Sequence, residues 1–209
     1  MLPFLCEIER ESYDKNKRIQ MDYVRPIPLR PRGSNWRVGL LITAFVVLVA
    51  GIGMAKSESF EWVVLKATLR TKFPNVRWIS TEQLASWLAD HSRQEPVLLD
   101  VRTEAEWNVS HLPRARRVDP GSSALPALAG VAKDRPIVTY CAVGYRSGAM
   151  ASTLRRAGYS DVRNLEGSIF QWANEHRPLV RDGEPASQVH PFSTLWGRLL
   201  AGEVRAPLK

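Results

Sequence analysis

The chain has 209 residues, of which 44% are hydrophobic and 24% charged, a composition typical of a protein that folds around an apolar core. The formal net charge is +8, but the basic residues are scattered and no nucleic-acid-binding motif accompanies them, so we expect no nucleic-acid partner. The two cysteines, Cys6 and Cys141, lie on opposite sides of a long apolar segment. This excludes a disulfide framework, and no zinc or other metal site is expected.

The apolar segment, VGLLITAFVVLVAGIGMA, spans residues 38–55 and contains no charge. At about 1.5 Å per residue, a helix of this length nearly crosses a hydrocarbon core of about 30 Å. Trp36 precedes it where an interfacial aromatic would lie. We therefore expect a single-pass transmembrane helix in contact with membrane lipid. A buried core helix and a cleaved signal peptide, with Gly53 and Ala55 near the cleavage site, are the alternatives.

Basic residues flank this segment on both sides, so the positive-inside rule does not fix which side of the membrane carries the rest of the chain. Residues 1–37 are rich in arginine and proline and predict a basic, flexible tail. Residues 56–75 place apolar residues such as Trp62 and Leu69 at helical intervals. They predict a juxtamembrane helix or linker, its helix ending before Pro74.

Residues 76–182 alternate between helix and strand signals. Two segments open with capping-box spacing, Ser80 with Gln83 and Thr103 with Glu106. Short apolar runs between the helical segments indicate strands buried on both faces, which are typical of parallel sheets. We predict an α/β domain with a mostly parallel central sheet flanked by helices. The expected helical segments are 80–91, 103–109, 122–130, 147–158 and 168–176, and the expected strands are 96–101, 115–119, 135–141 and 161–167.

Two of the predicted strands end in residues suited to chemistry. Cys141 ends one of them, and Asp100 and Arg102 lie at the end of another. Ligands of parallel sheets bind at the carboxyl ends of the strands, so these residues are expected at one edge. Gly144 permits a tight loop after Cys141, and a helix then begins. Such a loop turns backbone N–H groups inward at the positive end of the helix dipole, which favours a negatively charged sulfur.

The segments CAVGYRS, LLDVRTEAEWNVSHLPRA and NLEGSIFQWA resemble the single-domain rhodanese sulfurtransferases over about residues 76–180. The resemblance implies that Cys141 takes a sulfane sulfur from a small anionic donor such as thiosulfate, becomes a persulfide and passes the sulfur to cyanide or a thiol. It implies no metal and no organic cofactor. The amides expected to cradle the persulfide and the departing anion, and so to bind the substrate, belong to Ala142, Val143, Gly144, Tyr145 and Arg146. The expected supporting residues are Asp100, Arg102, Glu106 and Ser147, with Arg102 and Glu106 spaced to pair across one helical turn.

Two other functions fit the same fold. Related phosphatases of the cell-cycle-regulating type have five residues between cysteine and arginine, whereas four lie between Cys141 and Arg146 here. The smaller loop suits a single sulfur atom better than a tetrahedral phosphate. The other alternative is a tethered binding module without catalysis.

The sequence departs from the family pattern at three positions. Arg114 and Ser168 stand where glycines are usual, and Trp107 stands at a customary tyrosine position. Arg114, with the arginines at 116 and 117, either builds a basic rim that attracts anions or is simply solvated. We expect Trp107 to pack, and His111 to hydrogen-bond the backbone.

Residues 183–209 form a C-terminal extension. Its segment VHPFSTLWGRLL either packs on the domain or makes a second membrane-proximal contact through Phe192, Trp196 and Leu199.

Overall fold

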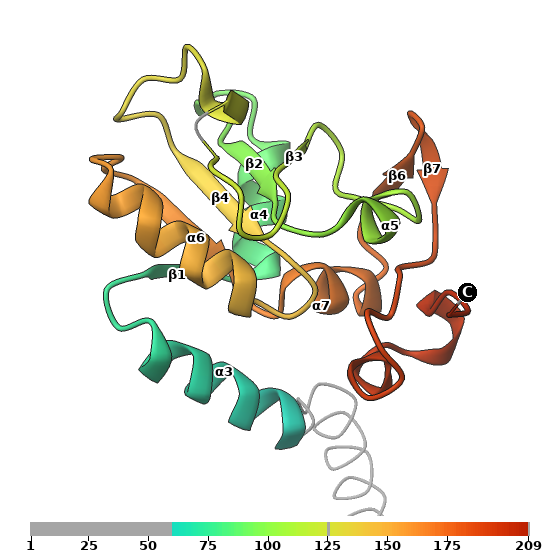
Figure 1. The fold of residues 1–209 in the computed structure, drawn as a ribbon. Coiled ribbons are helices and arrows are strands. Elements are labelled where there is room, and N and C mark those ends of the chain that lie inside the picture. Colours follow the sequence, from blue (N-terminus) through green and yellow to red (C-terminus); the bar gives the residue numbers. More distant parts are fainter. Residues whose placement is uncertain (1–59, 125, 209) are drawn as a thin grey trace, which may run out of the picture. The chain divides into compact units, whose positions relative to one another are not determined.

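The computed structural model describes residues 60–124 and 126–208, all within one compact unit, Glu58–Lys209 (Figure 1). The predicted tail at 1–37 and the predicted transmembrane helix at 38–55 lie outside the described residues. Within the described part of the chain, no helix is both long enough and apolar enough to cross a bilayer.

A five-stranded parallel sheet forms the centre of this unit, as predicted (Figure 1). Its strands follow the order β1-β5-β4-β2-β3, and every neighbouring pair is parallel. Strands β2 and β4 are buried along their whole length because side chains pack against both faces of the sheet. The strand bounds are β1 Arg77–Ile79, β2 Val97–Asp100, β3 Arg116–Arg117, β4 Ile137–Tyr140 and β5 Val162–Leu165.

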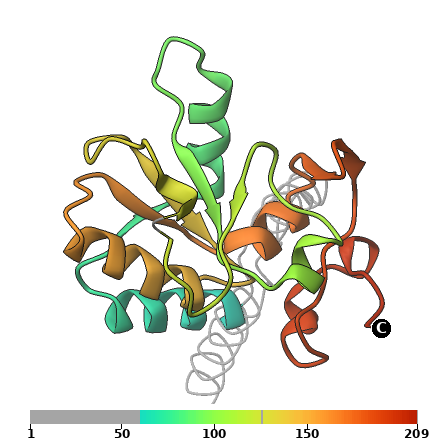
Figure 2. The same ribbon diagram turned by 45° about the horizontal axis from the view of Figure 1, so that its top comes forward.

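Helices cover both faces of the sheet (Figure 2). Both predicted capping boxes are present, at the starts of α4 and α5. Helix α6 begins at Tyr145, two residues earlier than predicted, and the predicted helical turn at 122–130 is a short 3-10 helix. The helix bounds are α3 Phe60–Lys72, α4 Thr81–Ala89, α5 Glu104–Trp107, η1 Pro126–Leu128, α6 Tyr145–Arg156 and α7 Ser168–Asn174.

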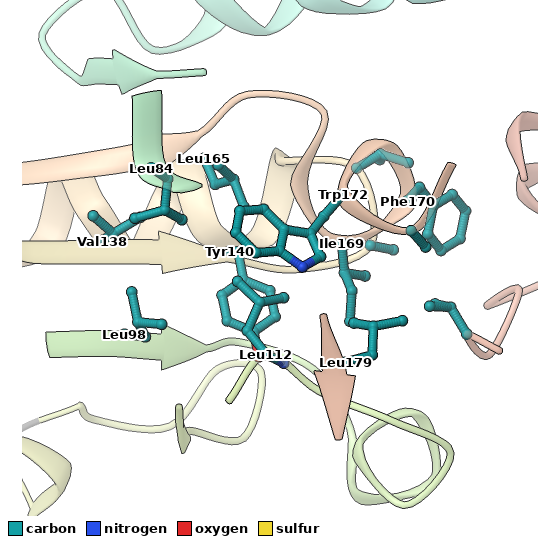
Figure 3. Packing of buried hydrophobic residues seen from close by; sticks show 14 of the residues in the cluster. Leu84, Leu98, Leu112, Val138, Tyr140, Leu165, Ile169, Phe170, Trp172 and Leu179 are labelled. Atoms are coloured by element: carbon teal, nitrogen blue, oxygen red, sulfur yellow. Dashed lines mark hydrogen bonds between the residues drawn. The ribbon is translucent and has the colours of Figure 1, made fainter. Parts of the chain in front are cut away.

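Successive strand residues point to opposite faces and divide the core into two clusters. Leu98 and Val138 pack with the side chains of α4 and α7 in the larger cluster (Figure 3). Leu99 and Ile137, their chain neighbours, pack on the other face with residues of α6 such as Leu154. This alternation fixes the register of the sheet, and with it the positions of the strand ends that carry the site.

Three strands lie where none was predicted. β1 has three residues, and only Ile79 is buried, so its apolar pattern is too short to detect. β6 Leu179–Arg181 and β7 Glu184–Ala186 form an antiparallel hairpin. Asp182 and Gly183 turn this hairpin with φ angles of 51° and 86°, and an Asp-Gly pair is a strong hairpin signal that sequence reasoning left unused.

The residues that replace two usual glycines adopt the backbone conformation that glycine would. Arg114 has φ 61° and Ser168 has φ 51°, both in the left-handed region. Arg114 forms an ion pair with Glu95 at 2.9 Å, and the Ser168 hydroxyl donates to the Leu165 carbonyl at 3.1 Å. The turns at residues 114 and 168 therefore form without the usual glycines. The neighbouring arginines are also engaged, Arg116 with the carbonyl of residue 127 and Arg117 with the carboxylate of residue 119.

The C-terminal extension packs against the domain. The Ser110 hydroxyl donates to the Gln188 carbonyl at 2.6 Å, and the side-chain amide of Asn174 in α7 donates to the Leu199 carbonyl at 2.7 Å. The extension contains two short 3-10 helices, η2 Trp196–Leu199 and η3 Gly202–Val204.

Candidate functional site

Cys141 directly follows β4, where the loop to α6 begins. Its Sγ accepts a hydrogen bond from the Gly144 N–H at 3.1 Å. Its own N–H donates to the Ser168 hydroxyl at 3.3 Å, and its carbonyl accepts from the Ile169 N–H at 3.2 Å. The first turn of α7 therefore fixes the backbone of Cys141 through these two hydrogen bonds. Sequence reasoning missed this role of Ser168, which only the packing of α7 against the loop reveals.

Gly144 has the backbone conformation that the loop needs. Its φ is 115°, which side chains rarely allow, and a Cβ there would lie 3.2 Å from the Leu69 Cδ1 of α3. The Gly144 carbonyl accepts from the Gly148 N–H at 3.0 Å and from the Asn164 amide at 2.9 Å. The loop is thus held from two sides, and Gly144 is positioned to donate to sulfur.

The structure specifies which amide of the predicted cradle reaches the sulfur. Of the amides from Ala142 to Arg146, that of Gly144 is the one for which the structure gives a hydrogen bond to Sγ. The first turn of α6 begins at Tyr145, and the N–H groups of a first helical turn have no carbonyl partner within the helix. These groups lie at the positive end of the helix dipole, where an anion is stabilised.

Arg146 is clamped by Glu106. The two guanidinium Nη atoms each donate to one carboxylate oxygen at 2.7 Å, a bidentate pair between α6 and α5. Burial opposes both charges, but the pair outweighs burial: the pKa of Glu106 lies below its usual value and the pKa of Arg146 above. Arg146 is therefore a fixed positive charge next to Cys141.

The predicted ion pair between the Arg102 and Glu106 side chains is wrong. Arg102 precedes Thr103, the N-cap of α5, so the spacing of a helical turn does not apply to it. It bends back to Asp100 instead, with Nη2 to Oδ2 at 2.6 Å, and reaches Glu106 through that residue's backbone carbonyl at 3.3 Å.

Arg102 and Asp100 are fully buried and form a structural support. Arg102 also donates to the Ser110 carbonyl at 2.6 Å, which ties the segment after α5 to the end of β2. Burial disfavours the charge of Arg102, but the charge and hydrogen bonds of Asp100 raise its pKa above the usual value. Tyr140 lies beside this pair, and burial raises the pKa of its hydroxyl. Arg102 and Asp100 thus position the site and are absent from the lining of the cavity beside Cys141.

The thiol of Cys141 borders a small, mostly apolar cavity of about 160 Å³. Cys141 itself is only 1% exposed. Phe192 and Trp196 of the C-terminal extension contribute to its lining, a role that sequence reasoning did not foresee. The lining residues are Cys141, Ala142, Val143, Tyr145, Arg146, Phe192 and Trp196.

The other singled-out residues lie around the site. Ser147 is buried at the start of α6, and its carbonyl accepts from the Thr139 hydroxyl at 3.0 Å. Trp107 packs as expected, stacked on His111 with ring centroids 3.5 Å apart. A ring nitrogen of His111 lies 3.1 Å from the backbone oxygen of Leu112, the kind of contact expected for it. Within residues 60–124 and 126–208, no group of three or more potential metal ligands is present.

A cysteine at the carboxyl end of a parallel strand, with an amide on its sulfur and an arginine on the following helix, defines an α/β protein with a cysteine-containing loop at the edge of its sheet. Residues 82–175 match the family described as Rhodanese-like domain. A protein named "Sulfurtransferase" from Allochromatium vinosum is 35% identical over 105 residues, which are 50% of this chain and 95% of that protein. The chain belongs to the rhodanese-like family.

Other relatives share only part of their length with this chain. The "Probable adenylyltransferase/sulfurtransferase MoeZ" of Mycobacterium tuberculosis is 34% identical over 103 residues, or 48% of this chain, which spans only 25% of MoeZ. A "tRNA uridine(34) hydroxylase" of Erwinia tasmaniensis is 32% identical over 40% of this chain and 25% of its own. Among solved structures, a rhodanese-like domain protein from Staphylococcus aureus is 26% identical, covers 51% of this chain and 99% of its own, and has a TM-score of 0.44.

Proposed function

We propose that this protein is a sulfurtransferase in which Cys141 carries the transferred sulfur as a persulfide. The observation that carries the proposal is the Gly144 N–H donating to the Cys141 Sγ at 3.1 Å, beside a cavity that the clamped Arg146 also lines. An amide aimed at sulfur, a helix N-terminus and a fixed cation all stabilise negative charge there. The sulfurtransferase relative from Allochromatium vinosum supports the same chemistry.

The reaction has two displacements. In the first, the Cys141 thiolate attacks the outer sulfur of thiosulfate; the S–S bond of the donor breaks, a new S–S bond forms, and sulfite leaves with the electron pair. In the second, cyanide attacks the outer sulfur of the persulfide, which releases thiocyanate and restores the thiolate. The preorganised amide stabilises the charged sulfur in both steps.

The test is thiocyanate formation by the purified full chain from thiosulfate and cyanide. The proposal predicts turnover that is lost in Cys141→Ser, while hydrolysis of an aryl phosphate stays at the background rate. Aryl phosphatase activity without thiocyanate formation would reverse the assignment.

A binding module without catalysis is the second candidate, favoured by the 1% exposure of Cys141. Alkylation at neutral pH separates the two. A Cys141 that iodoacetamide modifies faster than free cysteine supports the catalyst, and one that it modifies no faster supports the module.

We also propose that residues 38–55 anchor the protein in a membrane. The support is the charge-free apolar sequence itself. The full chain is expected to stay in the membrane pellet after an alkaline wash, and Val47→Arg, which places a charge mid-segment, is expected to release it. Recovery of the unmodified chain in the supernatant would contradict this anchor, and protease accessibility in intact cells would show which side carries the domain.

A further inference from the structure

Residues 190–199 of the C-terminal extension form a loop, called here the aromatic loop, with both ends fixed to the domain. Before it, the Gln188 carbonyl accepts from the Ser110 hydroxyl of the domain at 2.6 Å, and Val189 is fully buried. At its other end, the side-chain amide of Asn174 in α7 donates to the Leu199 carbonyl at 2.7 Å. The aromatic loop is therefore held at a defined position on the domain.

Two aromatic side chains of this loop lie at the site. Phe192 and Trp196 line the cavity that borders Cys141. The Phe192 ring lies 4.8 Å from the Arg146 Cζ, a cation–π contact. Phe192 is 45% exposed, so it contributes little to the core, and its position is better explained by its contact with Arg146 and the cavity that it lines.

The loop itself holds Phe192 in place. The φ of Phe192 is 63°, in the left-handed region that bulky residues rarely adopt. Its N–H donates to the His190 Nδ1 at 3.0 Å, and the Trp196 N–H contacts the Ser193 hydroxyl at 3.3 Å. A strained aromatic residue that is held by local hydrogen bonds and lines the same cavity as Cys141 indicates a functional position.

The cavity that these rings line is small. Its volume of about 160 Å³ lies below the roughly 300–1,000 Å³ of sites for drug-sized ligands. Its walls are mainly apolar, and the Arg146 side chain is 21% exposed. A compact anion or a slender thiol fits this space. Because Cys141 is 1% exposed and the cavity beside it is narrow, we expect a small molecule to reach its sulfur more readily than a thiol on the surface of a folded protein.

We propose that Phe192 and Trp196 select sulfur donors and acceptors by size and restrict Cys141 to small molecules, excluding thiols on folded proteins. This inference rests on the proposed sulfur transfer and names the class of acceptor, a low-molecular-weight nucleophile. Opening the aromatic loop admits larger partners.

The first test compares acceptors with thiosulfate as the donor. The probes are cyanide and reduced thioredoxin, and the readout is the ratio of their kcat/KM values. Phe192→Ala combined with Trp196→Ala is expected to raise the thioredoxin-to-cyanide ratio by about tenfold or more. Phe192→Ala alone, at a half-exposed position, serves if the double variant is unstable. Leu195→Ala is the matched control, because Leu195 lies in the same loop, is 65% exposed and is absent from the cavity lining.

The second test does not depend on sulfur transfer. The full chain carrying Cys6→Ser reports on one thiol, and its alkylation is followed with iodoacetamide and with a maleimide bearing a polyethylene glycol chain. The unmodified loop is expected to slow the bulky reagent strongly relative to the small one, and the Phe192→Ala, Trp196→Ala variant is expected to remove most of that difference.

The outcomes separate this inference from the proposed function. Size selection is overturned if the unmodified loop does not slow the bulky maleimide relative to iodoacetamide at Cys141. It is also overturned if the difference between the two reagents persists in the variant with both alanine substitutions. If the loop slows the bulky reagent as expected but the protein forms no thiocyanate, size selection at Cys141 is supported and the sulfurtransferase assignment is refuted.

Discussion

Glu106 and Arg146, 40 residues apart in the chain, are joined by two parallel hydrogen bonds of 2.7 Å each. Glu106 belongs to α5, which follows β2, and Arg146 belongs to α6, which follows β4. β2 and β4 are neighbours in the sheet, with Asp100 beside Tyr140. The pair therefore ties together two segments that follow the carboxyl ends of adjacent strands, next to Cys141.

Replacing Glu106 by Gln is expected to weaken both stability and turnover. Gln keeps the capping box with Thr103 but removes the charge that holds Arg146. Because Arg146 is partly exposed, we expect a moderate loss of about 1–3 kcal/mol in the free energy of unfolding, measured by urea denaturation. Turnover falls because Arg146 is no longer fixed. Glu104→Gln, at an exposed position of the same helix, is the control, and equal behaviour of the two variants would argue against the clamp.

Gly144→Ala is expected to impair sulfur transfer beyond its cost in stability. Alanine at φ 115° is strained and meets Leu69, so the loop shifts and the amide moves away from Sγ. Loss of this donor is expected to lower kcat by about tenfold or more. Gly130→Ala is the matched control, since Gly130 also has a positive φ, 76°, but a Cβ there meets nothing within 4 Å. A Gly144 variant with the turnover of the Gly130 variant would show that this amide is dispensable.

The stability of the aromatic loop is expected to depend on His190. Burial lowers the pKa of His190 below 6.5, with Glu106 opposing this shift and Arg102 adding to it. The unfolded chain therefore binds this proton at higher pH than the folded chain does, and stability present above about pH 6.5 is lost as the pH falls through that value. Protonation also removes the acceptor for the Phe192 N–H.

The measurement is the urea midpoint between about pH 7 and pH 5.5. His190→Asn keeps a side-chain acceptor but does not titrate, so its midpoint is expected to fall less over this range. Parallel pH profiles for the two proteins would show that His190 makes no such contribution.

Arg102→Lys is expected to be severely destabilising. Arg102 is completely buried and serves Asp100 and two backbone carbonyls at once, a geometry that a lysine ammonium cannot reproduce. We expect a loss of about 3–5 kcal/mol in the free energy of unfolding. Arg70→Lys, in the exposed pair with Glu166, is expected to change stability by less than about 0.5 kcal/mol. Similar losses in both variants would contradict a special role for the buried pair.

Local patterns explain why much of the fold was predictable. The capping boxes at Ser80 and Thr103 depend on residues three apart, and strands β2 and β4 are short apolar runs, so each signal is complete within a few residues. Because β2 and β4 are parallel neighbours, their carboxyl ends place Asp100 and Cys141 at the same edge of the sheet. These predictions succeeded because their signals are local.

The rest of the site depends on contacts that spacing does not encode. The partner of Glu106 is Arg146 and not the nearby Arg102, because the chain bends before α5 begins. Phe192 reaches the site only through the packing of the extension against α7. Ser168 adopts the left-handed conformation at a turn where glycine is usual, and its hydroxyl donates a hydrogen bond to the Leu165 carbonyl. Such relationships become visible only in three dimensions.

The central claim is that the sulfur of Cys141 carries the transferred atom. Mass spectrometry of the full chain after incubation with thiosulfate tests this most directly. The account predicts that the peptide containing Cys141 gains the mass of one sulfur atom, that cyanide removes it, and that Cys141→Ser never acquires it. An unchanged Cys141 peptide in a protein that forms thiocyanate, or no added sulfur under any donor concentration, would contradict it.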